Sequence, residues 1–207
     1  MAITYPLSLP DYTTISGIDF RAINSVAYSQ SPFSFAGQTH TYSGQMWSVD
    51  ITLKPMRRDT AEAWVAWLIS LRGQHGTFLL SDPISHAIQG TATAATISGS
   101  AGDNTVSAVV TSGQTLKAGD FLALGTGSDS TLHKVLENYT GTGSAADLEI
   151  WPSLRKTRSA VSADLTSANG LFRLSSNEIA YSVSNLSVYG ISSVSYTHLT
   201  LPTTPYV

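Results

Sequence analysis

A single stretch of the chain has the pattern of an amphipathic helix, and this pattern limits the folds open to the rest of the sequence. Over residues 56–73 the large apolar side chains return at helical spacing. At about 100° per residue they fall within one stripe roughly 100° wide, typical of a helix that packs one face on a core. The stripe consists of Trp64, Trp67, Leu68 and Leu71. Because it carries two indoles, we expect the helix to cover an open β-sheet.

The expected helix spans residues 59–72. Asp59 fits the N-cap, and Glu62 fits the acidic partner of a capping box three residues later. Gly73 stands where a left-handed residue commonly ends a helix. The face opposite the indoles carries little charge, which indicates either a subunit interface or a plain helix surface. The residues of this face are Glu62, Ala66, Ile69 and Ser70.

Strand patterns flank the helix on both sides. Apolar residues alternate with polar ones over residues 47–53, which predicts a half-buried antiparallel strand. Further strands are expected at 18–31, 38–44 and 77–80, with a turn at 32–37. The expected core anchors of this part are Trp47, Trp64, Trp67, Leu68, Leu71 and Phe78.

The composition changes near residue 85 to one rich in Ala, Thr, Ser and Gly. Short strands separated by Gly/Ser turns are expected at 105–111, 121–124, 132–137 and 147–151, which is typical of a small barrel or sandwich. A disordered linker is disfavoured, because Phe121 and Trp151 need a core. From residue 170 strand patterns like those of the first part return, at 171–174 and 180–191.

These patterns predict a mainly β chain with one α-helix. A β-sandwich host domain, residues 1–84 and 170–192, is interrupted by an inserted small β-barrel of OB-like type, residues 85–169. Residues 194–207 show no sustained period and look like translated sequencing-adaptor read-through. We therefore expect 193–207 to be a non-native tail without a role in the fold; the alternative is a genuine disordered tail.

Composition excludes several classes of function. Charged residues make up 12% of the 207 residues, about half the usual share, which suits large surfaces buried between subunits. The net charge is −3 and no basic run exceeds Arg57-Arg58, which argues against nucleic-acid binding. Cysteine is absent, which excludes disulfides and thiolate chemistry. Without a membrane-length apolar run or a signal peptide, we expect a soluble protein made in the cytoplasm.

The sequence offers no convincing catalytic group. Ser81, Asp82 and His86, with His75 upstream, are the best candidates for a nucleophile and its base, but nothing around them resembles a nucleophile elbow. A polar turn explains them better. We therefore expect no enzymatic activity.

Metal and cofactor sites are not expected either. The acidic residues of the insert do not have the spacing of a calcium loop, and solvated turns account for them. The histidines are too dispersed to suggest zinc. These residues are Asp120, Asp129, Asp147 and Glu149, and His40, His75, His86 and His133.

The aromatic residues leave one binding function open. Trp47, Trp64 and Trp67 lie on core-facing patterns, so a sugar-binding platform would have to use the insert. Trp151 and Tyr139 are its candidates there, although a place in the barrel core is the better interpretation of Trp151.

Ordered motifs over most of residues 20–191 resemble the distal tail proteins of long-tailed, siphovirus-type bacteriophages. The strongest part of the resemblance runs from Trp47 to Pro83. The motifs are GQMW at 44–47, LKPMRR at 53–58, AEAW at 61–64, GQHGTFLL at 73–80, LKAGDF at 116–121, LHKV at 132–135, IWPSLR at 150–155, GLFRLSSN at 170–177 and VYGI at 188–191.

The resemblance implies a structural protein of the virion. It implies a ring of copies of the chain, a hexamer, at the tail tip, which joins the tail tube to hub, baseplate or fibre proteins. It carries over no catalytic residue and no cofactor. The alternatives within a phage tail are a carbohydrate-binding component and a cell-wall hydrolase.

Overall fold

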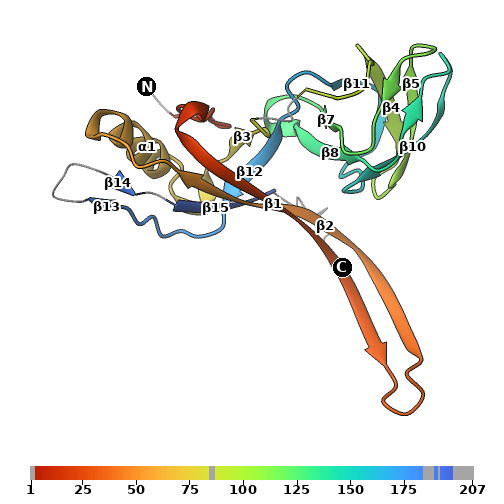
Figure 1. Cartoon of the computed structure of the whole chain (residues 1–207), viewed down its shortest axis with the longest axis horizontal. Helices are drawn as coiled ribbons and strands as arrows, with labels where there is room; N and C mark the ends of the chain where they lie inside the picture. Colours follow the sequence, from red (N-terminus) through yellow and green to blue (C-terminus); the bar gives the residue numbers. More distant parts are fainter. Residues whose placement is uncertain (1–2, 84–86, 184–188, 191, 198–207) are drawn as a thin grey trace, which may run out of the picture.

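The structure is a computed structural model that describes residues 3–83, 87–183, 189–190 and 192–197. Figure 1 shows a sheet with one helix, a barrel beside it, and a long two-stranded hairpin that leaves both. The prediction of a mainly β chain with one helix and a barrel module is therefore confirmed.

Five antiparallel strands form the main sheet, in the order β1-β2-β15-β12-β3. Their bounds are β1 Ile15–Gln30, β2 Gly37–Leu53, β3 Phe78–Leu80, β12 Gly170–Leu174 and β15 Ser192–Thr197. The N-terminal segment lies along the outer edge of β3, where Leu7 forms a parallel bridge with Phe78. A separate two-stranded sheet joins β13 (Ser182–Val183) and β14 (Tyr189–Gly190).

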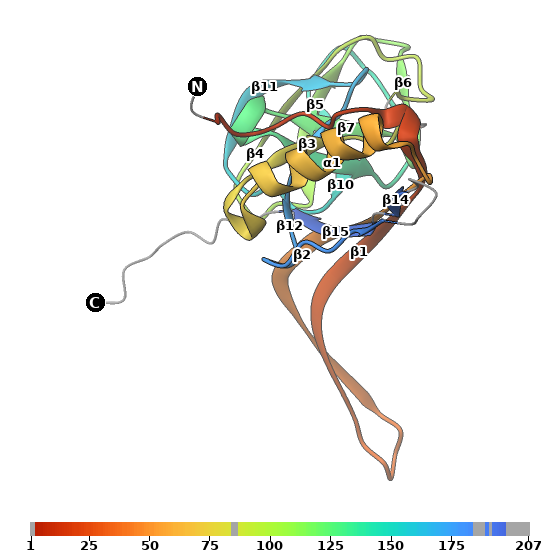
Figure 2. The ribbon, with the colours of Figure 1, turned by 90° about the vertical axis from the view of Figure 1, so that its left-hand side faces the viewer.

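Helix α1 (Arg58–Ser70) covers one face of this sheet, as its indole stripe predicts (Figure 2). Trp64, Leu68 and Leu71 are buried in one cluster with Phe78 and Phe172 of the sheet. Trp67 is only partly buried and packs edge-on against Phe78, with ring centroids 5.1 Å apart. The helix therefore forms the second layer of the host part.

The predicted N-cap of the helix is wrong, whereas Gly73 is left-handed as predicted but is not the first left-handed residue after the helix. Arg57 is the N-cap and makes no side-chain capping bond, so Asp59 lies inside the first turn, where its charge still favours the helix dipole. The expected capping box with Glu62 is therefore not formed; Glu62 instead pairs with Arg58 one turn away, at 3.9 Å. At the other end Arg72 already adopts the left-handed conformation, with φ 51°, one residue before Gly73 at φ 65°.

Six strands close into the barrel, in the order β10-β5-β4-β11-β7-β8. An OB-type barrel has five strands, so this barrel has one more. A short strand pair, β6 (Thr115–Leu116) with β9 (Tyr139–Thr140), packs Leu116 and Tyr139 into the barrel core. The barrel strands are β4 Ala95–Gly99, β5 Thr105–Val110, β7 Phe121–Leu124, β8 Thr131–Val135, β10 Ala146–Trp151 and β11 Arg158–Asp164.

The barrel and the sheet share a core. Phe121, Ala123 and Leu132 of the barrel belong to the same buried cluster as the sheet and helix residues. Most of the barrel interior forms a second cluster, which includes Ile97, Leu122 and Leu148. The barrel is therefore packed on the host part through one of its sides.

The expectation that the C-terminal segment takes no part in the fold is wrong for residues 193–197. They belong to β15, which pairs with β2 on one side and with β12 on the other. A strand flanked by two partners completes the hydrogen bonds of both neighbours, so this segment joins the two halves of the sheet. Residues 198–207 lie outside the described part.

Candidate functional site

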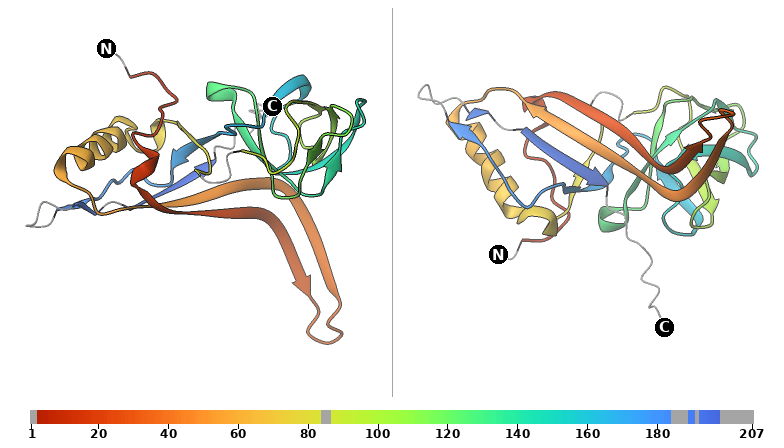
Figure 3. Two further views of the ribbon diagram at one scale, coloured as in Figure 1. Left: turned by 45° about the horizontal axis from the view of Figure 1, so that its top comes forward. Right: turned by 90° about the horizontal axis from the view of Figure 1, so that it is seen from below.

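The outer half of the β1–β2 hairpin extends away from the rest of the molecule (Figures 1 and 3). We call residues 22–46 the arm. Its two strands pair from Ala22 with Trp47 to Gln30 with Gly37, and a tip of residues 31–36 joins them. Nearly every residue from 22 to 43 is exposed. An isolated two-stranded hairpin is marginally stable in water, so an arm of this length is expected to be supported by a partner.

The arm contains no Asp, Glu, Lys or Arg. Exposed edge strands in soluble proteins usually carry such charges, because charge discourages unwanted strand pairing. The cores of protein interfaces are, in contrast, depleted in charge and enriched in aromatic residues. The arm therefore has the composition of a surface that is covered in the functional state.

Among the described residues, the large apolar side chains with the highest exposed fractions lie on this arm. Phe33 is 95% exposed and Phe35 is 75% exposed, both at the tip. Phe35 has a φ of 55°, a conformation that a bulky side chain rarely adopts. Along the strands, Tyr28, Tyr42 and Val26 are also more than half exposed.

Local contacts order the arm and its tip. The Phe35 amide donates to the carbonyl of Ser31 at 2.9 Å, and the Ser31 amide donates to that of Ala36 at 3.0 Å. The ring of Tyr28 lies over Gly37, where a Cβ atom would come within 2.8 Å of it. These contacts give the tip one defined shape.

A β-bulge sets the direction of the arm. Pairing shifts from Asn24 with Gln45 to Val26 with Thr41, so the ladder is irregular between them. Bulges bend a hairpin and increase its twist. The arm turns away from the plane of the sheet in this region (Figure 3).

The barrel forms hydrogen bonds with the root of the arm. The Trp151 indole donates to Asn24 Oδ1 at 2.7 Å, and the Ser153 amide donates to Gln45 Oε1 at 2.7 Å. Arg155 also donates to the Gln45 carbonyl. The interpretation of Trp151 as a barrel-core residue is therefore wrong: it lies at the junction, because its ring packs edge-on against Trp47 at 4.4 Å.

Trp47 is the central residue of this junction. It is 5% exposed, and its indole donates to the carbonyl of Leu132 on β8 at 3.0 Å. Its ring also lies 5.8 Å from the rings of both Phe20 and Phe121. The Trp47 side chain, at the root of the arm, therefore contacts the barrel by both a hydrogen bond and ring packing.

A small pocket of about 70 Å³ opens at the same junction. Its apolar walls come from Trp47, Leu132, Pro152 and Leu171. Three charged residues also line it, Asp129, Arg155 and Lys156, and Lys156 is paired with Asp129. We call this the junction pocket.

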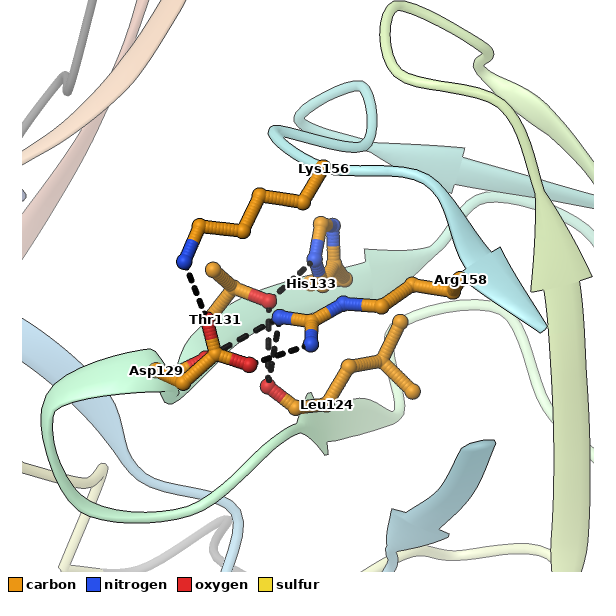
Figure 4. A network of polar contacts seen from close by, with 6 residues as sticks. All are labelled: Leu124, Asp129, Thr131, His133, Lys156 and Arg158. Carbon is orange, nitrogen blue, oxygen red and sulfur yellow. Dashed lines mark hydrogen bonds and ion pairs between the residues drawn. The ribbon is translucent and has the colours of Figure 1, made fainter. Parts of the chain in front are cut away.

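A polar network beside the pocket fixes the barrel segments that line it (Figure 4). Asp129 accepts from Lys156 at 2.7 Å and from Arg158, which is 8% exposed. Arg158 also donates to the Asp129 carbonyl at 3.0 Å. These hydrogen bonds lower the pKa of Asp129, against the opposing effect of its partial burial. The network holds the loop before β8 to the start of β11.

His133 is fully buried in this region. Its Nδ1 lies 2.7 Å from the Pro152 carbonyl and must carry the proton, because a carbonyl only accepts. Its Nε2 lies 3.0 Å from the Thr131 hydroxyl. Burial lowers the pKa of His133 to about 4, so the ring is neutral at pH 7. It serves the barrel as a neutral core residue.

Of the four candidate catalytic residues, the structure describes Ser81, Asp82 and His75. The Ser81 hydroxyl contacts the Tyr12 hydroxyl at 3.3 Å, and His75 packs edge-on against Tyr5 at 5.8 Å. Asp82 lies in the turn that leaves β3. His86 lies outside the described residues. No nucleophile–base pair is formed among the three that are described.

The acidic residues and histidines of the insert are also dispersed. Asp120 accepts three backbone amides, from Gln89, Gly90 and Lys117, so it holds a turn, but it is buried and not solvated as predicted. Asp147 is exposed, and Glu149 accepts from Thr105 across the strands. His40 lies on the arm, in β2, whereas His133 is buried in β8 of the barrel. Within the described ranges no group of three or more metal-binding side chains is found.

Among the described helices, none is long and apolar enough to cross a membrane. On the outer face of α1, Glu62 and Ala66 are exposed and Ile69 is 56% exposed. Ser70 is half-buried and donates to the carbonyl of Trp67 at 2.6 Å. A subunit contact at this face stays a prediction.

Sequence analysis predicted the strands of the arm but missed the arm as a site. The signal that could have found it is the absence of charge from residues 22–46 together with two phenylalanines in a predicted turn. In comparisons with known proteins, no protein-family model matches the chain and no curated protein matches it.

Proposed function

We propose that this protein is a structural subunit of a bacteriophage tail tip, which assembles into a closed ring of identical copies and joins the tail tube to baseplate or fibre proteins. The observation that carries the assembly role is the arm: a long, exposed, charge-free hairpin with aromatic residues at its tip. The phage assignment rests on the ordered sequence motifs. We expect six copies in the ring, from the same resemblance.

Assembly would explain why the arm lacks the charges that usually protect exposed strands. A neighbouring subunit would cover the aromatic side chains and the open edges of the hairpin, which otherwise favour aggregation. An arm that leaves one subunit and contacts a different surface of the next makes a heterologous contact, and such contacts close into rings when the rotation fits. The barrel, which holds the arm root, would fix its direction.

The other two functions lack a comparable observation. A sugar platform needs exposed aromatic faces, yet Tyr139 is 7% exposed and donates to the Ala108 carbonyl, while Trp151 is engaged at the junction. A hydrolase needs convergent acid and base groups. We therefore propose a structural role.

The test compares the full chain with an arm-shortened variant in which Asn-Gly replaces residues 27–40. Val26 and Thr41 are paired, so a two-residue turn can join them. The full chain should form rings by light scattering and electron microscopy, and the shortened variant should be a folded monomer. A full chain that stays monomeric at high concentration would refute the proposal.

A further inference from the structure

We propose that the arm tip of one copy inserts Phe33 into the junction pocket of a neighbouring copy, with Phe35 packed at the pocket mouth. This inference rests on the proposed ring assembly and identifies the two surfaces that meet in it. It combines two features that lie far apart in one molecule: an exposed aromatic tip and a pocket with apolar walls.

The tip has the properties of an anchor. Phe33 is the most exposed large apolar residue of the described part, at 95%. The hydrogen bonds of the tip hold it in one shape, so little conformational freedom is lost on binding. Exposed aromatic side chains on ordered loops commonly supply much of the binding energy of an interface.

The pocket has the complementary chemistry. Trp47, Leu132 and Leu171 provide apolar contact for a ring. Arg155, which donates to the Gln45 carbonyl, and Lys156, which is paired with Asp129, also line the pocket and leave its apolar walls open to a ring. The arm carries no charge, so it brings neither an unpaired ion nor repulsion to this site.

The size of the pocket suits part of one ring. A cavity of about 150 Å³ holds a whole benzene molecule. The junction pocket, at about 70 Å³, accommodates roughly half of that, which is the outer edge of a phenyl ring. The rest of the ring would lie at the mouth, beside the cationic side chains and Phe35.

The tip cannot fill the pocket of its own chain. Trp47 is at the arm root, and Gly37 is at the far end of the same strand. At about 3.3 Å per residue, ten residues of extended strand place the tip about 30 Å from the pocket. The arm also points away from the body in Figures 1 and 2 and in the left view of Figure 3. A tip that enters this pocket must therefore belong to a second copy.

The first test removes either partner of the contact. Phe33→Ala tests the tip, and Ser128→Trp fills the pocket from an exposed position on its border. Leu136→Ala and Ser112→Trp are matched controls, because both residues are exposed on the barrel away from the pocket lining. Phe33→Ala and Ser128→Trp should each raise the concentration needed for assembly by about 30-fold or more, the loss typical of an interface anchor. The controls should assemble like the unmodified chain.

The second test maps the contact directly, using the absence of native cysteine. Chains with Ser34→Cys are mixed with chains carrying Ser128→Cys, and a short bis-maleimide is added. Crosslinked dimers should form in this mixture and not when Ser112→Cys replaces Ser128→Cys.

The outcomes separate this inference from the proposed function. Rings that form normally in Phe33→Ala and give no Ser34–Ser128 crosslink would overturn the tip-in-pocket contact and leave ring assembly standing. Crosslinking to Ser112 instead would overturn it as well. An unmodified chain that never assembles would overturn both proposals.

Discussion

Replacing Trp47 with Ala should destabilise the protein strongly and uncouple the barrel from the sheet. Trp47 lies in the one core cluster that contains residues of both parts. Its removal takes away the ring that packs against Trp151 at 4.4 Å and leaves the Leu132 carbonyl without its indole donor. The loss therefore combines a cavity, an aromatic contact and a buried hydrogen bond.

The expected magnitude follows from these contacts. Truncation of a buried Trp to Ala costs about 3–5 kcal/mol, a total that includes the lost packing and the cavity. Trp47→Phe keeps most of the apolar contact and loses the N–H donor, so about 1–2 kcal/mol is expected. In a chain of 207 residues, about 4 kcal/mol lowers the melting temperature by roughly 8–16 °C.

Denaturant unfolding, followed by fluorescence and by far-UV circular dichroism, measures this effect. The unmodified chain should unfold in a single transition, because the shared core couples its parts. Trp47→Ala should show two transitions, or one at clearly lower denaturant. Leu136→Ala, which changes a side chain that is 54% exposed, is the control. A Trp47→Ala variant no less stable than this control would show that the junction does not join the two parts.

Three further predictions concern individual residues. His133 is protonated near pH 6.5 in the unfolded chain and only near pH 4 in the folded chain, so the free energy of unfolding should fall by up to about 3 kcal/mol as the pH is lowered between these values. Urea midpoints measured from pH 7 to 4.5 should show this decrease, and His133→Gln should flatten it. Asp129→Ala should lower the free energy of unfolding by about 2–4 kcal/mol in the same assay, because it leaves the buried Arg158 guanidinium without its carboxylate. Lys156→Ala should lower it by less than about 1 kcal/mol, since this ion pair is exposed, and equal losses in the two variants would contradict this reasoning. Gly73→Ala should lower the melting temperature more than Gly102→Ala. Both positions have a positive φ, but only at Gly73 would the new Cβ meet backbone, at 2.8 Å from Asn177 Cα. A similar loss in both variants would refute this steric argument.

The strands with alternating or strongly apolar sequences could be predicted, because burial on one face leaves a period of two. Residues 121–124 form β7 with the expected bounds, and residues 47–53 form the last part of β2, which begins ten residues earlier, at Gly37. Strands β4 and β11 were missed, because Ala, Ser and Gly contribute little to a hydrophobic pattern although Ala95 and Ile97 are fully buried. Closure of a barrel is a long-range property that such short segments do not encode locally.

The predictions for the helix ends and for the C-terminal segment differ from the structure for another reason. Asp59 fits an N-cap by residue type, but the helix starts one residue before it, since tertiary packing of α1 decides its first turn. Residues 194–197 lack a clear period, yet they complete a ladder between two existing strands, where backbone hydrogen bonds determine pairing. The arm was hidden because exposed strands have no burial pattern to detect.

The position of β15 has a consequence for the order of folding during synthesis. Its partner Thr52 emerges from the ribosome long before Ser192, so β2 must wait for most of the chain before its second ladder can form. All barrel strands are made in that interval and pair only with one another, so they can fold first. The barrel would then position Trp47 and the hairpin. Strand β15, which is made last, would complete the sheet by pairing with β2 and β12.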